Sequence, residues 1–375
     1  MSQALEAAWR KAPESLEALG RQRRASSVEA VNASWLSAPA AVALSQRNGG
    51  LSAADGRETE LELALPVWRP GQRAASRQAS DAESSVLQAQ ERRARWQLLG
   101  ELREAMAAVQ LAQIELQEAE LRAHGLRQLA DDVARRVRAG DLAPADELAS
   151  RAQWLEAHGR VQAAIQGLAA RRSAWSLLTG LEQLPVDEVF AAPSRSVPDT
   201  HPELVHSAAE VEFAYRRIRQ LQTVRSGAPE VNLGVRHESA GTGSGRGQRS
   251  VVIGLRVPVG GEVHRQPEIE QALAELDLVR ARQHRLRERL ASDLLLAEQQ
   301  LQVGQMRQQA ETERTALLEQ RAGHIDRAFR AGESALTEVL QSQALAAESR
   351  VALARQRVEL HLARVRLEHL TGVLP

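Results

Sequence analysis

Cysteine is absent from the 375 residues of this chain, and aromatic side chains make up only 3% of it. Without thiols the chain cannot form a disulfide bond, a thiolate nucleophile or a cysteine-based zinc site. So few aromatic side chains also leave little material for a large, closely packed core. These absences argue against a disulfide-stapled fold and against a stack of ordinary globular domains.

A surplus of charge of either sign is missing too, because 48 Lys and Arg residues balance 48 Asp and Glu residues. Phosphate binding requires an excess of basic residues, so nucleic acid is excluded as the main partner. No apolar run approaches the roughly 20 residues of a membrane-spanning helix. The segment Met1–Lys11 has no apolar stretch of the signal-peptide kind. A soluble protein with this start would be cytoplasmic, whereas an exported one would be in its mature form or have a misassigned start.

What is abundant is alanine, arginine, leucine, glutamate and glutamine, the composition of long helices. The chain also repeats itself. Arg138-Ala139-Gly140 recurs as Arg330-Ala331-Gly332, and Leu178-Thr179-Gly180 recurs as Leu370-Thr371-Gly372 at the same spacing. We infer an internal duplication, with repeat unit one at 1–185, a proline-rich linker at 186–200 and repeat unit two at 201–375.

The two units predict the same order of elements. Each opens with one helix, Ser2–Val31 or Pro202–Arg225, followed by a β-hairpin at about 38–67 or 229–259. A long helix follows at 70–139 or 265–331, which would measure roughly 100 Å at 1.5 Å per residue. Glycine ends each long helix at a tip, 138–146 or 330–338, and a second helix returns at 144–180 or 334–372.

The predicted strands alternate apolar and polar residues, as in Leu61, Leu63 and Leu65 of the first hairpin. The register of the first strand is left open, because alanine fills much of it. Two isolated hairpins are not stable in water, whereas short alternating strands suit an outer-membrane β-barrel. Four strands cannot close a barrel, so several chains would have to combine. The polar residues would then line the barrel lumen, although an ordinary polar sheet face is the alternative: Glu60, Glu62, Arg236 and Arg256.

This layout resembles the TolC-like outer-membrane efflux family over essentially the whole chain. The resemblance rests on the order and spacing of motifs that are individually weak: Arg138-Ala139-Gly140-Asp141-Leu142 with Asp146, Arg330-Ala331-Gly332-Glu333-Ser334 with Glu338-Val339-Leu340, the two Leu-Thr-Gly endings, and His201-Pro202-Glu203-Leu204. The subfamily that serves heavy-metal exporters of the resistance-nodulation-division class looks closest.

The resemblance implies a mainly α fold with a small β part, in which a homotrimer forms a twelve-stranded transmembrane barrel and a long α-helical coiled-coil barrel. It implies a bacterial outer-membrane location, with the helices in the periplasm and the strands in outer-membrane lipid. The implied partners are a periplasmic adaptor protein and an inner-membrane pump. The implied activity is passive export of small molecules or metal ions, with no catalysis and no cofactor.

The same resemblance implies roles for residues at the tips. Eight of them would dock the adaptor: Arg138, Gly140, Asp141, Leu142, Arg330, Gly332, Glu333 and Ser334. Glu338 and Gln341 would form the periplasmic gate, with Gln341 standing where the family has a second acidic residue. The gate should therefore be less cation-selective than a double acidic ring. Asp146, the counterpart of Glu338, would lie on the outer wall; for both acids, simple stabilisation of a helix start is the alternative.

Ten histidines invite a metal site, but they form no HExxH pattern, and His361 and His369 lie eight apart on a charged helix. We expect them to be solvated surface residues, and we expect no metal site. Two other functions stay open: a soluble coiled-coil scaffold, and the outer-membrane component of type I protein secretion. An enzyme is disfavoured, since no nucleophile and base are brought together by the motifs.

Overall fold

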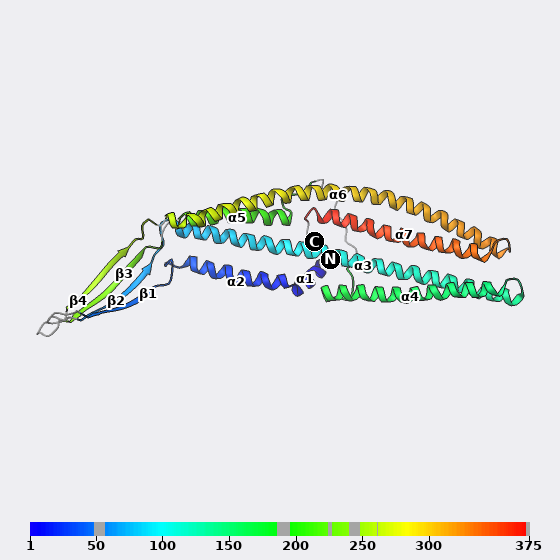
Figure 1. The fold of residues 1–375 in the computed structure, drawn as a ribbon, viewed down its shortest axis with the longest axis horizontal. Coiled ribbons are helices and arrows are strands. Elements are labelled where there is room, and N and C mark those ends of the chain that lie inside the picture. The colour runs from blue at the N-terminus through cyan, green and yellow to red at the C-terminus, as the bar shows by residue number, and fades with distance from the viewer. Residues whose placement is uncertain (49–56, 186–195, 224–226, 240–247, 261, 373–375) are drawn as a thin grey trace. The chain divides into compact units, whose positions relative to one another are not determined.

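The computed structural model describes residues 1–48, 57–185, 196–223, 227–239, 248–260 and 262–372. It is mainly helical with one four-stranded antiparallel sheet, as the sequence predicts (Figure 1). The elements in chain order are α1 (Ser2–Lys11), α2 (Pro13–Ala33), β1 (Ala41–Asn48), β2 (Arg57–Pro66), α3 (Gln72–Ala139), α4 (Pro144–Thr179), α5 (Pro202–Thr223), β3 (Glu230–Ser239), β4 (Gln248–Arg256), α6 (Glu262–Arg330) and α7 (Leu336–His369).

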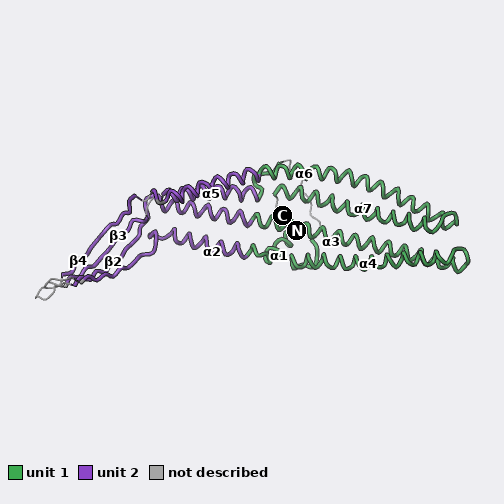
Figure 2. The backbone as a smooth tube through the Cα atoms, viewed as in Figure 1, with its two compact units in different colours: residues 1–15, 92–202, 287–375 green, residues 16–91, 203–286 purple. Residues whose placement is uncertain are grey.

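The chain forms two compact units, which are coloured separately in Figure 2. The helical unit contains residues 1–15, 92–202 and 287–375, and the strand-bearing unit contains residues 16–91 and 203–286. Both long helices contribute to both units, because α3 and α6 each cross a boundary. Of the predicted linker at 186–200, residues 186–195 lie outside the described residues.

The prediction of a single opening helix over Ser2–Val31 is wrong. Ala12 has an extended backbone with φ −66° and ψ 133°, so α1 ends before it and α2 begins at Pro13. A proline ring disfavours the helical conformation of the residue before it and suits the first position of a new helix. The break is therefore a local consequence of one proline.

The sheet has the strand order β1-β2-β3-β4, with every neighbouring pair antiparallel. Leu44 pairs with Leu61, Leu61 with Val235, and Val235 with Val251, which fixes the register that the alanine-rich first strand left open. Paired residues project from the same side of a sheet and successive residues from opposite sides, so the sheet has two chemically distinct faces. The apolar face carries Val42, Leu44, Leu61, Leu63, Leu65, Val231, Leu233, Val235, Val251, Ile253 and Leu255.

In the helical unit, apolar residues from four helices meet in one cluster. Val133 of α3 and Val339 of α7 are fully buried, together with Ala157 of α4 and Phe329 of α6. In the strand-bearing unit, Ala214 and Ile218 of α5 pack against Ala272 and Leu276 of α6. None of the helices in the described part of the chain combines the length and hydropathy needed to cross a membrane.

Candidate functional site

Both tips of the helical unit are built by the same backbone turn. Gly140 and Gly332 have φ of 87° and 82°, a left-handed conformation that favours glycine. The backbone N–H of Asp141 donates to the carbonyl of Arg136 at 2.9 Å, and that of Glu333 donates to Ala328 at 2.8 Å. These bonds satisfy carbonyls at the ends of α3 and α6, so each long helix stops and the chain turns back.

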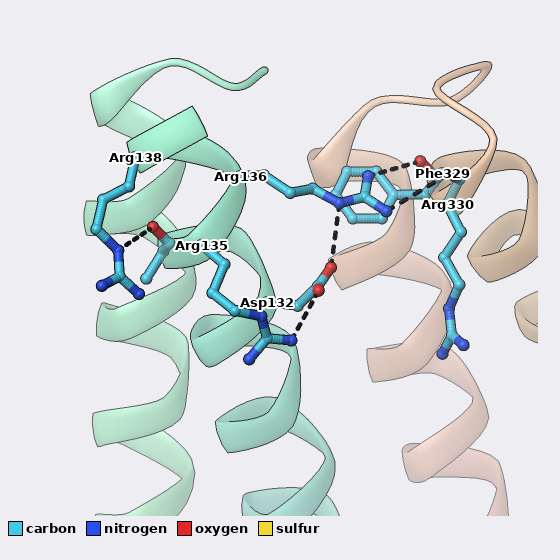
Figure 3. Close-up of polar contacts among 7 residues, drawn as sticks. Asp132, Arg135, Arg136, Arg138, Phe329 and Arg330 are labelled. Carbon is cyan, nitrogen blue, oxygen red and sulfur yellow. Dashed lines mark hydrogen bonds and ion pairs between the residues drawn. The ribbon is translucent and has the colours of Figure 1, made fainter. Parts of the chain in front are cut away.

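Arg136, which no sequence motif marks as special, connects the two tips (Figure 3). Its guanidinium donates to the backbone carbonyl of Phe329 at 3.1 Å and lies 5.0 Å from the centre of the Phe329 ring. It also pairs with Asp132 one turn earlier on α3, at 3.2 Å. A guanidinium can engage a carbonyl, a ring and a carboxylate at once, because its donors and its planar face are separate. Arg136 thus fixes the end of α3 against the end of α6.

The residues predicted to dock an adaptor occupy different environments. Arg138, Asp141, Arg330 and Glu333 are exposed. Arg138 donates to the carbonyl of Ala134 on its own helix, and Arg330 pairs with Asp326 at 2.9 Å. Leu142, by contrast, is partly buried against the apolar cluster of the tips, so part of its side chain supports the turn. The charged members of the set are those available to a partner.

The two acidic residues that follow the tips also differ. The carboxylate of Asp146 accepts the backbone N–H of Ala143 at 3.3 Å and so caps the start of α4. Glu338 is exposed in the first turn of α7 and accepts a hydrogen bond from the hydroxyl of Ser334. Gln341, also exposed, follows one turn later. Asp146 therefore has a structural role in the single chain, while Glu338 and Gln341 present polar groups outward together.

The four residues predicted to line a lumen share the polar face of the sheet, which carries Ser45, Arg47, Glu58, Glu60, Glu62, Glu230, Asn232, Arg236, Glu238, Ser250 and Arg256. Arg236 lies 2.7 Å from Glu58 and 3.5 Å from Glu60 across the β2–β3 pair. Arg256 lies 3.9 Å from Glu230. Opposite charges thus face each other across neighbouring strands, the arrangement that stabilises a sheet face in contact with water.

The expectation that the histidines are solvated is wrong for four of those that the structure describes. His201 is fully buried, His206 is 8% exposed, and His361 and His369 are partly buried. The indole of Trp96 stacks on the ring of His369 at 4.1 Å, and His201 meets the same indole edge-on at 4.8 Å. The indole N–H also donates to the backbone carbonyl of His369 at 2.9 Å. Helix packing brings these three rings together, and no local sequence pattern predicts this contact.

The surroundings of His369 favour its neutral form. Burial, reinforced by the positive charge of Arg103 and by His201, lowers the pKa of His369 to about 4. Gly100 makes room for the ring, since a Cβ there would approach it to 3.1 Å. Among the described residues, no group of three or more His, Cys, Asp or Glu side chains could hold a metal ion. The cluster is therefore best described as a packed aromatic contact.

No protein-family model matches the sequence, and no curated protein matches it. Solved structures do. The outer membrane protein VceC of Vibrio cholerae has a TM-score of 0.77 and 14% identity, over 99% of this chain and 95% of VceC. A membrane protein of Pseudomonas aeruginosa has a TM-score of 0.76 and 15% identity, over 99% of this chain and 90% of its own.

The outer membrane channel CmeC of Campylobacter jejuni follows with a TM-score of 0.74 and 11% identity, over 99% of this chain and 85% of CmeC. This chain has the TolC-like outer-membrane channel fold. The resemblance inferred from the sequence is thereby confirmed for the fold, since the similarity includes almost every residue. Two of the solved structures with this fold, CmeC and MtrE of Neisseria gonorrhoeae, are outer membrane channels.

Proposed function

We propose that this chain is the outer-membrane channel of a tripartite efflux system, in which it forms a trimer and conducts small molecules or metal ions passively. Its partners would be a periplasmic adaptor and an inner-membrane pump. The channel fold supports this proposal, and so do the outer-membrane channels that share it.

The apolar face of the sheet carries the proposal. Val42, Leu44, Val251 and Ile253 are each at least 70% exposed in the single chain, although a soluble protein would bury such a row. The opposite face is lined with paired charges, so only a lipid-facing apolar surface and a watery lumen suit both faces at once. Four strands are too few for closure, whereas three copies supply twelve. A soluble scaffold would leave the apolar face without a role.

The two tips provide the residues that we assign to adaptor docking and to the gate. We assign the exposed charges at Arg138, Asp141, Arg330 and Glu333 to adaptor docking, because they surround two turns of the same kind. Glu338 and Gln341 form the gate if three copies of α7 converge, since each side chain would then appear three times in one ring.

The proposal is tested with the full chain purified in mild detergent. Light scattering corrected for bound detergent should give the mass of three chains of 41.0 kDa. The same sample should produce discrete ionic conductance in planar lipid bilayers. A monomer that stays soluble without detergent and gives no conductance would show that the barrel, the trimer and the channel are all wrong.

A further inference from the structure

Charged residues are sorted between the two faces of the sheet. All five acidic residues of the described strands lie on the polar face: Glu58, Glu60, Glu62, Glu230 and Glu238. The apolar face has no acidic residue among the described positions, yet it carries two arginines and a histidine. We call these three exposed residues the basic rim: Arg57, His237 and Arg249. The basic rim therefore gives positive charge to the apolar face, which would contact lipid under the proposed function.

The three side chains of the basic rim lie close together. His237 is the direct partner of Arg249 across the β3–β4 pair. Arg57 pairs with Ser239, which places it diagonal to His237. Direct partners have Cβ atoms about 5 Å apart and diagonal neighbours about 7 to 8 Å apart, both within reach of long side chains. One anionic group could therefore contact two or three members of the rim.

The basic rim also has a defined position along the strands of the sheet. The chain leaves the sheet for α3 after Pro66, whereas the hairpin ends of the strands, where Asn48 pairs with Arg57 and Glu238 with Gln248, lie at the opposite end. The rim lies at that hairpin end, beginning two residues beyond the last apolar row of Leu44, Leu61, Val235 and Val251. Two residues are about 7 Å along a strand, so the rim follows directly where the apolar surface stops.

We propose that the basic rim binds the phosphate groups of an anionic lipid headgroup in the outer leaflet. This inference rests on the proposed function, because it requires the apolar face to contact acyl chains. Arg249 must keep its charge in a polar layer at this height, and the described strands offer it no carboxylate on this face. Lipid phosphates supply negative charge at this height, and arginine is suited to bind them through several donors. In a trimer the site would occur three times around the barrel.

The test uses the detergent-solubilised full chain, with diphosphoryl lipid A in mixed micelles as the probe and a neutral galactolipid as the comparison. The trimer and its conductance are verified first. Native mass spectrometry then measures the bound lipid as a function of its concentration. We expect Arg249→Gln to weaken lipid A binding about fivefold, the effect of removing one charge near a membrane surface. The loss should shrink at high salt, where charge attraction is screened.

Arg47→Gln is the matched control. Arg47 is an exposed strand arginine near the same hairpin end, but it lies on the polar face, so its removal should leave lipid A binding unchanged. Equal loss in both variants, no loss in Arg249→Gln, or equal binding of the galactolipid by the parent would overturn the lipid site. A conducting trimer with any of these results would leave the channel intact and refute the lipid site alone, whereas a chain that forms no trimeric pore would refute the proposed function itself.

Discussion

Burial, together with the nearby positive charge of Arg103, favours the neutral imidazole of His369, and this has a consequence for stability. Its pKa falls from an ordinary 6.5 to about 4 in the folded chain, so between these values the unfolded chain binds more protons. Stability from this residue is complete above about pH 6.5 and is lost as pH falls toward 4. The full shift corresponds to roughly 3 kcal/mol.

We therefore expect the thermal midpoint of the full chain in detergent to fall between pH 6.5 and pH 4. His369→Phe keeps an aromatic ring against Trp96 but cannot take up a proton, so its midpoint should fall less over the same range. The contributions of other groups are common to both proteins and cancel in the comparison. Parallel pH profiles for parent and variant would show that His369 does not carry this dependence.

Glu338 allows a second test at the residue scale. Three carboxylates in one ring attract cations, so Glu338→Gln should lower cation preference and block by multivalent cations in bilayer recordings. Glutamine can still accept the hydrogen bond of Ser334, which isolates the charge. Asp146→Asn is the matched control, because Asp146 caps α4 and should not alter selectivity. Unchanged selectivity in Glu338→Gln would leave Glu338 as a first-turn acid and place the gate elsewhere.

At the scale of elements, the two Leu-Thr-Gly endings look alike in sequence but differ in packing. Gly180 and Gly372 have φ of 76° and 74°, so alanine at either costs about 1 to 2 kcal/mol. A Cβ at Gly372 would also lie 2.7 Å from Cδ of Pro202 and 2.9 Å from Cα of His201. A Cβ at Gly180 would meet only the movable end of Lys11. Denaturant unfolding should show a larger loss for Gly372→Ala, and equal losses would contradict the contact.

The tips are elements whose exposed charges can be reversed without disturbing the turn. Arg138→Glu and Arg330→Glu should reduce cross-linking to a periplasmic adaptor, mainly by slowing association. In Arg330→Glu, the new carboxylate would also be repelled by Asp326, the present ion-pair partner of Arg330. Arg330→Gln removes the positive charge without adding this repulsion, so it shows the effect of losing the charge alone. Arg127→Glu, an exposed change three turns before the tip, is the control and should cross-link normally. Cross-linking that is unaffected by all three tip substitutions, with the trimer intact, would count against docking at the tips.

At the scale of the whole molecule, the orientation of the sheet decides between a channel and a soluble scaffold. Ile253→Arg adds charge to the apolar face and should cost about 2 to 4 kcal/mol if that face meets the bilayer interior. Ala43→Arg adds the same charge to the polar face, directly opposite Glu62, and should cost little. The measurement is the fraction of trimer recovered from outer membranes and its unfolding in vesicles. In a soluble scaffold the two variants would behave alike, because both positions would face water.

Features that depend on local periodicity and local backbone preference could be predicted from the amino-acid sequence. Alternation in Leu61, Leu63 and Leu65 predicted strands, and glycine at 140 and 332 predicted where the long helices end. The break before Pro13 had a local signal as well, which the proline itself supplies. The mainly helical fold with four strands was predictable for this reason. The duplication and the roles of the tip and gate residues stay predictions.

Contacts between residues that are distant along the chain could be recognised only in the folded structure. Arg136 reaches Phe329 across 193 positions, and Trp96 reaches His369 across 273. Such pairs depend on how helices rotate and pack, which a period of 3.6 residues does not specify. The pairing of β2 with β3 is equally non-local, and it places Arg236 beside Glu60. Together with the β3–β4 pairing, it puts Arg249 on the face of the sheet that carries none of the strand carboxylates. Spacing fixes which residues share a face of one element, whereas packing fixes what that face meets.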